Sequence, residues 1–240
     1  MVIRQKIRKT AILISFILFP VTFYYFSPYL IIDGASQGII SGSFLTFGTL
    51  FVISLVIGRA FCGWACPAAG LQEACFKVNN QNFRAGKRDW VKYFIWVPWL
   101  SIIALMFIRA GRVKAVHPFY QTYYGISVSN IPALILFLII ASLIAIIAII
   151  AGKRGFCHYA CWMAPFMILG RKIQQSAKWP ALRLQATKDK CINCKTCSKN
   201  CPMSLDVNDM VARESMENTE CILCGTCVDN CPNGVIKYSL

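Results

Sequence analysis

The chain has 240 residues, of which 57% are apolar and only 15% are charged. An average soluble domain is about 45–50% apolar and about 25% charged, so the composition argues against an ordinary soluble enzyme and for membrane spans. The net charge is +15, but residues 191–240 carry 4 basic and 6 acidic side chains, so the positive charge belongs to the apolar part. There it indicates membrane topology and attraction to the lipid bilayer, and no nucleic-acid partner is expected.

Four apolar stretches are each long enough to cross the hydrocarbon core, which needs about 20 residues. We expect these spans at residues 11–30, 38–57, 91–110 and 131–151. A basic segment precedes the first stretch, but no small-residue cleavage pattern follows it. We therefore interpret the first stretch as an uncleaved anchor rather than a signal peptide.

The segments between the expected spans differ strongly in basic residues. Along the chain they contain four, none, five, three and eight Lys or Arg side chains, so alternate segments total seventeen against three. Because basic connections stay on the cytoplasmic side, both termini are predicted to be cytoplasmic. The predicted location is the inner (cytoplasmic) membrane, as a multi-pass protein.

A short motif occurs twice, 95 residues apart. Residues 61–66 follow the second expected span and residues 156–161 follow the fourth, and both read Phe-Cys-x-aromatic-Ala-Cys. Two pairs of spans that end in the same motif predict a two-fold internal repeat about an axis along the membrane normal. The repeat should bring four thiols together at the inner membrane edge: Cys62, Cys66, Cys157 and Cys161.

Four thiolates at one place could hold a third iron–sulfur cluster. A dithiol–disulfide relay or a different metal is an alternative, and so is burial of cysteine as a small apolar side chain. The duplication argues against burial alone, because packing would not require cysteine at both ends of both motifs. His158 lies inside the second motif, where hydrogen bonding beside a metal is favoured over ligation. Cys75 has no partner at metal spacing and is expected to be inert.

The last 50 residues contain two C-x2-C-x2-C-x3-C-P runs. This is the spacing of bacterial two-cluster ferredoxins, in which the fourth cysteine of each run ligates the other cluster. One [4Fe–4S] cluster is thus predicted on Cys191, Cys194, Cys197 and Cys231, and the other on Cys221, Cys224, Cys227 and Cys201. A pair of zinc sites is the alternative, but zinc sites rarely use three evenly spaced cysteines followed by Cys-Pro.

These elements predict a membrane protein of two folded parts. The fold class is an all-α four-helix transmembrane domain with a two-fold internal repeat, plus a small α+β two-cluster ferredoxin-like domain. The predicted boundaries are 1–170 for the membrane domain, 171–190 for a basic interfacial connector and 191–240 for the ferredoxin-like domain.

Other cofactors leave no signature in the sequence. No GxGxxG follows a strand and no CxxCH is present, so dinucleotide binding and covalent haem are not supported. The two histidines, His117 and His158, fall on opposite membrane faces in the predicted topology, which excludes a haem held by both. His117 lies among aromatic residues at the outer interface, where it could accept the proton of a quinol. Capping a helix end or contacting a headgroup is the alternative role.

The two motif types together resemble a known family. Residues 58–67 read Gly-Arg-Ala-Phe-Cys-Gly-Trp-Ala-Cys-Pro. With the C-terminal runs, this resembles the membrane-bound ferredoxin-type proteins of the NapH, NosR and NosH kind, which have four spans and two cytoplasmic CxxxCP motifs. In the second motif, Trp162 stands where the family has proline, with Pro165 three residues later. The resemblance implies the membrane component of a quinol dehydrogenase in anaerobic respiration, with quinone and other subunits of a respiratory complex as partners.

The predicted function is a membrane-bound iron–sulfur subunit rather than a stand-alone enzyme. It would pass electrons between the quinone pool and a partner oxidoreductase through two [4Fe–4S] clusters, or three if the CxxxC thiols hold another. Similarity to the copper-handling CcoG proteins gives one alternative, a maturation factor that reduces copper or a nascent metal cofactor. A structural membrane anchor whose clusters only stabilise the fold is the other.

Overall fold

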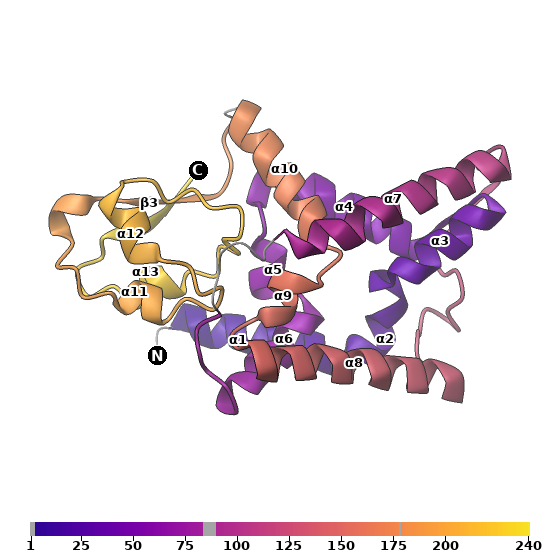
Figure 1. Ribbon diagram of the computed structural model, residues 1–240, viewed down its shortest axis with the longest axis horizontal. Coiled ribbons are helices and arrows are strands. Elements are labelled where there is room, and N and C mark those ends of the chain that lie inside the picture. Colours follow the sequence, from indigo (N-terminus) through magenta and orange to yellow (C-terminus); the bar gives the residue numbers. More distant parts are fainter. Residues whose placement is uncertain (1–2, 84–89, 178) are drawn as a thin grey trace.

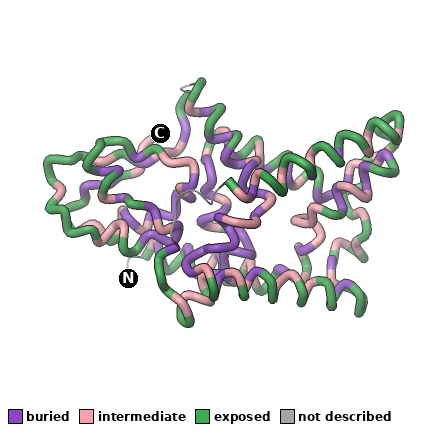
Figure 2. Tube along the Cα trace, viewed as in Figure 1, coloured by how far each residue is buried: buried purple, intermediate pink, exposed green. Residues whose placement is uncertain are grey.

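The computed structural model describes residues 3–83, 90–177 and 179–240. A compact C-terminal unit and a group of long helices lie at opposite ends of the molecule, and the short helices of the CxxxC motifs lie between them (Figure 1). Buried residues concentrate in this middle region, whereas the far ends of the long helices are largely exposed (Figure 2). The centre of packing therefore coincides with the cysteine motifs.

Two helices, α7 (Val91–Ala110) and α8 (Ile131–Ala151), are long and apolar enough to cross a membrane. At 1.5 Å per residue each is about 30 Å long, which matches the hydrocarbon core. Large apolar side chains of α8 remain uncovered by protein, such as Ile139 and Ile146, which are 57% and 53% exposed. A helix this apolar with so much exposed surface is suited to contact with lipid.

The first expected span, residues 11–30, is not one helix. The chain here forms four elements in succession: α1 (Ile3–Ile17), α2 (Phe19–Thr22), the 3-10 helix η1 (Phe23–Phe26) and α3 (Pro28–Gln37). Pro20 and Pro28 each lie in the first turn of a new helix, where the missing N–H removes no hydrogen bond. The chain bends by 59° after α1, so this segment makes a third span only if the bent pair crosses as one.

The second expected span, residues 38–57, begins later than predicted. Gly38 ends α3 with a φ of 75°, in the left-handed region that favours glycine. Strand β1 (Ile39–Ser41) follows and pairs in parallel with β2 (Ala115–His117), and only then does α4 (Gly42–Ile57) begin. With 16 residues, α4 is apolar but shorter than a typical span. The described residues thus contain two helices of spanning length, or three with the bent pair, where the sequence predicts four.

Short helices follow α4 and α8 and carry the CxxxC motifs. After α4 come α5 (Ala60–Trp64), α6 (Pro67–Ala74) and the 3-10 helix η2 (Cys75–Lys77). After α8 come α9 (Gly155–Tyr159) and α10 (Ala164–Ala177). Helix α10 packs along α4, and α6 packs along α1. Each motif is therefore held between a long apolar helix and a second, amphipathic helix.

The C-terminal unit is closed by a two-stranded antiparallel sheet of β3 (Arg183–Ala186) and β4 (Ile236–Ser239). Between the strands lie four short helical elements: η3 (Lys188–Lys190), α11 (Thr196–Lys199), α12 (Val207–Ala212) and α13 (Thr226–Asp229). Strand β3, which lies in the segment predicted as a connector, pairs with the C-terminal strand β4. The segment predicted as a connector is thus divided between α10 and the sheet.

Candidate functional site

The eight cysteines of the C-terminal unit line two separate cavities. One cavity is lined by Cys191, Cys194, Cys197 and Cys231. The other is lined by Cys201, Cys221, Cys224 and Cys227. Each cavity combines the first three cysteines of one run with the last cysteine of the other, which is the grouping of a two-cluster ferredoxin.

The thiols surround these cavities instead of meeting at a point. Among the residues that the structure describes, no three His, Cys, Asp or Glu side chains are gathered closely enough to hold a single metal ion. A zinc ion needs sulfur atoms about 2.3 Å from one centre. A [4Fe–4S] cubane instead spreads its four cysteine ligands around a cluster. Four cysteines around each of the two cavities are the ligand number that two cubanes need.

The backbone of both runs has the same unusual conformation. Asn193 and Lys195 in the first run have positive φ angles of 56° and 57°, and Leu223 and Gly225 in the second have 49° and 71°. Residues other than glycine seldom adopt this left-handed conformation. Alternation of right- and left-handed residues turns successive N–H groups to one side and forms the concave anion sites found around iron–sulfur clusters. Both runs are therefore built to hold an anionic group.

The two cavities differ in their exposure to solvent. Cys194 is exposed, and its neighbour Ile192 is 64% exposed. In the other cavity Cys201, Cys224 and Cys227 are buried. Burial raises the pKa of Cys201 to about 12, so this thiol would ligate as a thiolate only beside a strong Lewis acid such as iron. The first cavity is thus accessible from solvent, and the second faces the interior of the protein.

The two CxxxC motifs share one backbone geometry. Cys62 N donates to Arg59 O at 3.0 Å, and Cys157 N donates to Arg154 O at 2.9 Å. The second cysteine of each motif donates to the phenylalanine that opens it, at 3.0 Å for Cys66 and 3.1 Å for its counterpart Cys161. Helices α5 and α9 are both five residues long. The sequence repeat is therefore also a local structural repeat.

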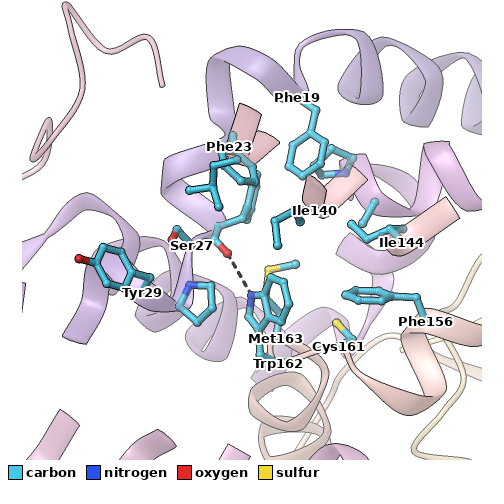
Figure 3. A pocket seen from close by; sticks show the side chains of 15 residues that line it. Phe19, Phe23, Ser27, Tyr29, Ile140, Ile144, Phe156, Cys161, Trp162 and Met163 are labelled. Atoms are coloured by element: carbon cyan, nitrogen blue, oxygen red, sulfur yellow. Dashed lines mark hydrogen bonds between the residues drawn. The ribbon is translucent and has the colours of Figure 1, made fainter. Parts of the chain in front are cut away.

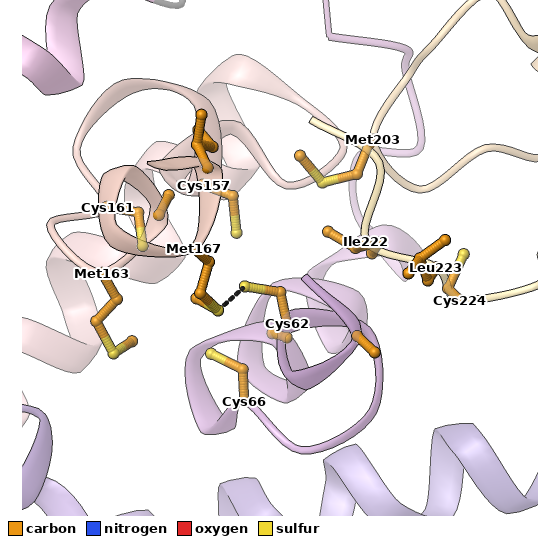
Figure 4. Packing of buried hydrophobic residues seen from close by; sticks show 14 of the residues in the cluster. Cys62, Cys66, Cys157, Cys161, Met163, Met167, Met203, Ile222, Leu223 and Cys224 are labelled. Atoms are coloured by element: carbon orange, nitrogen blue, oxygen red, sulfur yellow. Dashed lines mark hydrogen bonds between the residues drawn. The ribbon is translucent and has the colours of Figure 1, made fainter. Parts of the chain in front are cut away.

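The structure brings the four thiols of the two motifs together. Figure 4 shows Cys62 and Cys66 on one side facing Cys157 and Cys161 on the other, with the side chain of Met167 between them. Each of the four cysteines is at most 6% exposed, and Cys62 Sγ lies 3.9 Å from Met167 Sδ. The four thiols and the thioether therefore lie together in the buried core between the two motifs.

A buried cation stands three residues before the first cysteine of each motif. In the first motif this is Arg59, which is 1% exposed and donates to Glu220 at 2.7 Å. Lys92 of α7 donates to the other oxygen of the same carboxylate at 2.5 Å. Burial raises the pKa of Glu220, but the charges of Arg59 and Lys92 outweigh this and lower it to about 2. The carboxylate is therefore ionised and joins the C-terminal unit to the first motif.

The second motif repeats this arrangement with different partners. Arg154 is fully buried and pairs with Glu73 of α6, which also accepts from Arg8 of α1 at 2.8 Å. Arg154 Nη1 in addition donates to the backbone oxygen of Cys62 at 2.6 Å. Among the described residues, Nε of Arg154 and both Nε and Nη2 of Arg59 have no hydrogen-bond partner. Unused buried donors beside four cysteines fit a negatively charged cluster at this site.

Gln72 is a neighbour of the thiols that no motif in the sequence indicates. Its side chain is fully buried, and its Nε2 donates to Cys157 Sγ at 3.2 Å. His158, for which the sequence predicts such a role, is buried and stacks on Phe83 with ring centroids 4.3 Å apart. A glutamine six residues after a cysteine carries no recognisable signal, because the helix that aims it at the other motif is a tertiary feature.

The second ferredoxin run packs directly on the first CxxxC motif. A Cβ atom on Gly63 would lie 2.5 Å from the backbone oxygen of Ile222 and 3.4 Å from the Cα of Cys224. Trp64 Nε1 donates to the oxygen of Leu223 at 3.2 Å. Glycine at position 63 thus permits a backbone contact between α5 and the loop that contains Cys224. The buried cavity of the C-terminal unit is therefore next to the four-thiol site.

The remaining predicted residues lie elsewhere. His117 is exposed in β2, beyond the C-terminal end of α7. Lys92, at the opposite end of this helix, contacts Glu220 beside the cysteine motifs. The length of α7, about 30 Å, therefore separates His117 from the thiols. Cys75 is partly exposed in η2, nine residues after Cys66 in the sequence.

Comparison with protein families identifies both cysteine regions as iron–sulfur domains. Residues 190–236 match the family described as a 4Fe-4S dicluster domain. Residues 42–90 and 133–180 match the family described as a 4Fe-4S binding domain, and each of these segments contains one CxxxC motif. No solved structure matches the chain significantly.

Three curated proteins are distantly similar to the chain. "Putative electron transport protein YccM" of Escherichia coli (strain K12) is 26% identical over 203 residues, which cover 80% of this chain and 54% of that protein. "Uncharacterized protein MJ0750" of Methanocaldococcus jannaschii is 27% identical over 173 residues, 67% of this chain and 65% of that protein. The chain thus spans about half to two thirds of these relatives. It contains 4Fe–4S ferredoxin-type domains, and with the electron-transport relative these support a role in iron–sulfur electron transfer.

Proposed function

We propose that the protein is a membrane-bound electron carrier that passes electrons between a partner oxidoreductase and the quinone pool. One observation carries this proposal: the loop of Cys224 packs through Gly63 onto the helix of Cys62. The contact joins a ferredoxin-type cavity to a buried four-thiol site at the base of the apolar helices. A structural membrane anchor, whose clusters only stabilise the fold, would have no need to place these two sites in contact.

The proposal assigns one [4Fe–4S] cluster to each set of four cysteines. The first is held by Cys191, Cys194, Cys197 and Cys231, and the second by Cys201, Cys221, Cys224 and Cys227. The third is held by Cys62, Cys66, Cys157 and Cys161. When bound, each cluster supplies a one-electron carrier whose potential depends on burial and on hydrogen bonds to sulfur.

The structure supports a fixed order for these three sites. The first cavity has an exposed cysteine, Cys194, so it is where a partner protein would exchange electrons. The second cavity is buried and adjoins the four-thiol site through Gly63. Electrons would therefore pass from the exposed site through the buried one to the thiols of the CxxxC motifs, or in the reverse direction.

The residues around the four thiols tune the site. Arg59 and Arg154 bring two buried positive charges, which favour thiolates and a negatively charged cluster. Gln72 donates to the sulfur of Cys157, and such hydrogen bonds adjust the potential of a cluster. Burial of all four cysteines keeps water from the site.

We further propose that the apolar helices cross the inner membrane, with both termini on the cytoplasmic side. The long helices α7 and α8 support a membrane location. The excess of basic residues in alternate segments supports the orientation. A cytoplasmic ferredoxin unit then lies beside the inner leaflet, where the four-thiol site can exchange electrons with a lipid-soluble carrier.

Replacing Gly63 by alanine tests the order of the sites. The new methyl group would meet the backbone oxygen of Ile222, so the contact must open at a cost of about 1–3 kcal/mol. We expect the variant to keep its full iron content, but the ferredoxin unit should reduce the third cluster more slowly. Freeze-quench EPR of the anaerobic full chain measures this rate. Gly48→Ala is the matched control, because nothing lies within 4 Å of that position. Equal rates in both variants would refute the proposed order.

A specific observation favours copper handling as a second candidate function. Met167 lies among the four cysteines, and thiolates with a thioether are the soft ligands that select Cu(I). In this function a ferredoxin cluster would give one electron to a copper(II) ion, and the pair of Cys62 and Met167, whose sulfur atoms lie 3.9 Å apart, would then hold the copper(I) ion.

The variant Met167→Leu separates the two functions. If the site handles copper, Cu(I) affinity measured by competition with a chelator should fall by about 10–100-fold. If the site holds a cluster, the iron content should stay unchanged, because thiolates alone ligate the irons. Met106→Leu serves as the control, since Met106 belongs to α7 and is remote from the motif helices in sequence. Unchanged Cu(I) binding in Met167→Leu would eliminate the copper function at this site.

A further inference from the structure

An apolar cavity lies directly beside the four-thiol site. It has a volume of about 160 Å³, and its walls come from the broken segment α2–η1, from α8 and from the second CxxxC motif (Figure 3). Cys161, one of the four thiols, is part of its lining. The cavity therefore reaches from the surface of the apolar helices to a proposed ligand of the third cluster.

The walls of this cavity are suited to a flat ring. Phe19, Phe23, Phe26, Phe156 and Trp162 all contribute to its lining. Trp162 Nε1 donates to the backbone oxygen of Phe26 at 3.0 Å, which fixes the indole in the wall. Aromatic side chains pack favourably against a planar ring system. Trp162, which stands where the resembling family has proline, thus forms part of the cavity wall.

One polar group is placed to orient such a ring. Ser27 belongs to the lining, and its Oγ accepts from Leu30 N at 3.5 Å. A hydroxyl that accepts in this way keeps its own proton as a donor. Small-molecule sites typically combine apolar walls with a few polar groups that fix orientation. A carbonyl oxygen on the ligand would accept from Ser27.

One wall of the cavity is formed by a helix that is suited to contact with lipid. Leu136, Ile140 and Ile144 of α8 belong to its lining, and α8 is long and apolar enough to span a membrane. The opposite wall exists because α2 and η1 turn away from α1 by 59°. A water-soluble substrate would have to cross hydrocarbon to enter, whereas a lipid-soluble molecule would not.

We propose that this cavity binds the ring of a quinone from the membrane. The inference rests on the proposed electron-carrier function and places its membrane substrate on this side of the molecule, not at His117. Quinol oxidation here would release two electrons, which a cluster on the CxxxC thiols would accept one at a time, and two protons, which would pass to water at the membrane surface. The reverse reaction consumes two electrons and two protons.

Photolabelling of the full chain with an azido-quinone tests the location without relying on activity. The protein is purified anaerobically and placed in lipid nanodiscs, and labelled peptides are mapped by mass spectrometry. We expect label within residues 19–29 or 136–144, and we expect unlabelled quinone to prevent it. Label around His117 would overturn the inference, and so would displacement by a phospholipid that has no ring.

Filling the cavity provides the second arm of the test. Ile140→Trp should weaken binding of a short-chain quinone by at least about tenfold, because the larger side chain occupies the space of the ring. Leu143→Trp, three residues further along α8, is the control, since Leu143 is 46% exposed and absent from the lining. Equal affinity in the two variants would exclude this cavity. Iron content is measured in parallel: missing clusters contradict the proposed function, whereas intact clusters with label elsewhere contradict only this inference.

Discussion

Replacing Cys62 and Cys157 together by serine should lower the iron content of the anaerobically purified protein from about twelve to about eight per chain. Each residue is the first cysteine of a CxxxC motif, and their thiols face one another across the buried four-thiol site. Loss of one thiolate from each side leaves two donors where a cubane needs four. The two ferredoxin clusters should keep their dithionite-reduced EPR signals, because their cavities share no cysteine with this site.

The variant Cys75→Ser is the control for this experiment. Cys75 is a partly exposed cysteine of η2, close in sequence to the first motif but outside both cysteine sets. It should leave about twelve irons in place. An unchanged iron content in the double variant would assign the CxxxC thiols to redox or copper chemistry. Zinc at these sites in place of iron, in the unsubstituted protein, would end the electron-carrier proposal.

The C-terminal unit shows how far local spacing determines a site. Three cysteines within seven residues lie close together in any fold, so they line one cavity. The fourth cysteine of each cavity comes from the other run. The spacing therefore identifies both groups of four before any fold is known. The positive φ angles at Lys195 and Leu223 are not readable in the same way, since neither residue favours that conformation. The surrounding fold imposes them.

The membrane part shows where apolar length is a poor guide. Residues 11–30 contain no charged side chain, yet Pro20 and Pro28 divide them among several helices. Hydropathy averages over a window and does not register where a helix must restart. The resulting bend forms a wall of the cavity beside Cys161, so the feature that the span prediction missed is one that shapes a site.

The partners of the buried arginines are also beyond the sequence. Arg59 and Arg154 stand out only as basic residues before the motifs. Glu73 and Glu220 look like ordinary surface carboxylates, and Glu220 lies in an acidic stretch that suggests a solvated face. Only the tertiary fold shows that each carboxylate is shared by two buried cations. Long-range ion pairs of this kind leave no periodic signal.

Replacing Glu220 by glutamine should weaken the attachment of the ferredoxin unit to the membrane part. The carboxylate lies between the guanidinium of Arg59 and the ammonium of Lys92, whose side chains are 1% and 0% exposed. Glutamine keeps the size of the side chain but removes its charge, so two buried cations lose their counter-charge. Breaking a buried pair in this way costs about 3–5 kcal/mol. The loss of stability should be concentrated where the ferredoxin unit contacts the membrane part. Glu220 directly precedes Cys221 of the ferredoxin unit, and Arg59 precedes the first CxxxC motif.

Hydrogen exchange of the anaerobic full chain measures this effect where it arises. Amides of the loop around Leu223, which accepts from Trp64, should exchange at least about a hundredfold faster in Glu220→Gln. Glu217→Gln is the matched control, since Glu217 is an exposed carboxylate of the same loop, and such changes usually cost less than about 0.5 kcal/mol.

The double variant Lys92→Met with Glu220→Gln distinguishes charge from shape. It removes one of the two stranded cations while filling the same space, so part of the protection should return. Recovery would show that the lone carboxylate is needed because two positive charges are buried there. Equal protection in Glu220→Gln and Glu217→Gln would instead mean that the Gly63 contact and the Trp64 hydrogen bond hold the unit by themselves. The cluster order would then depend on packing at α5 and not on the buried ion pairs.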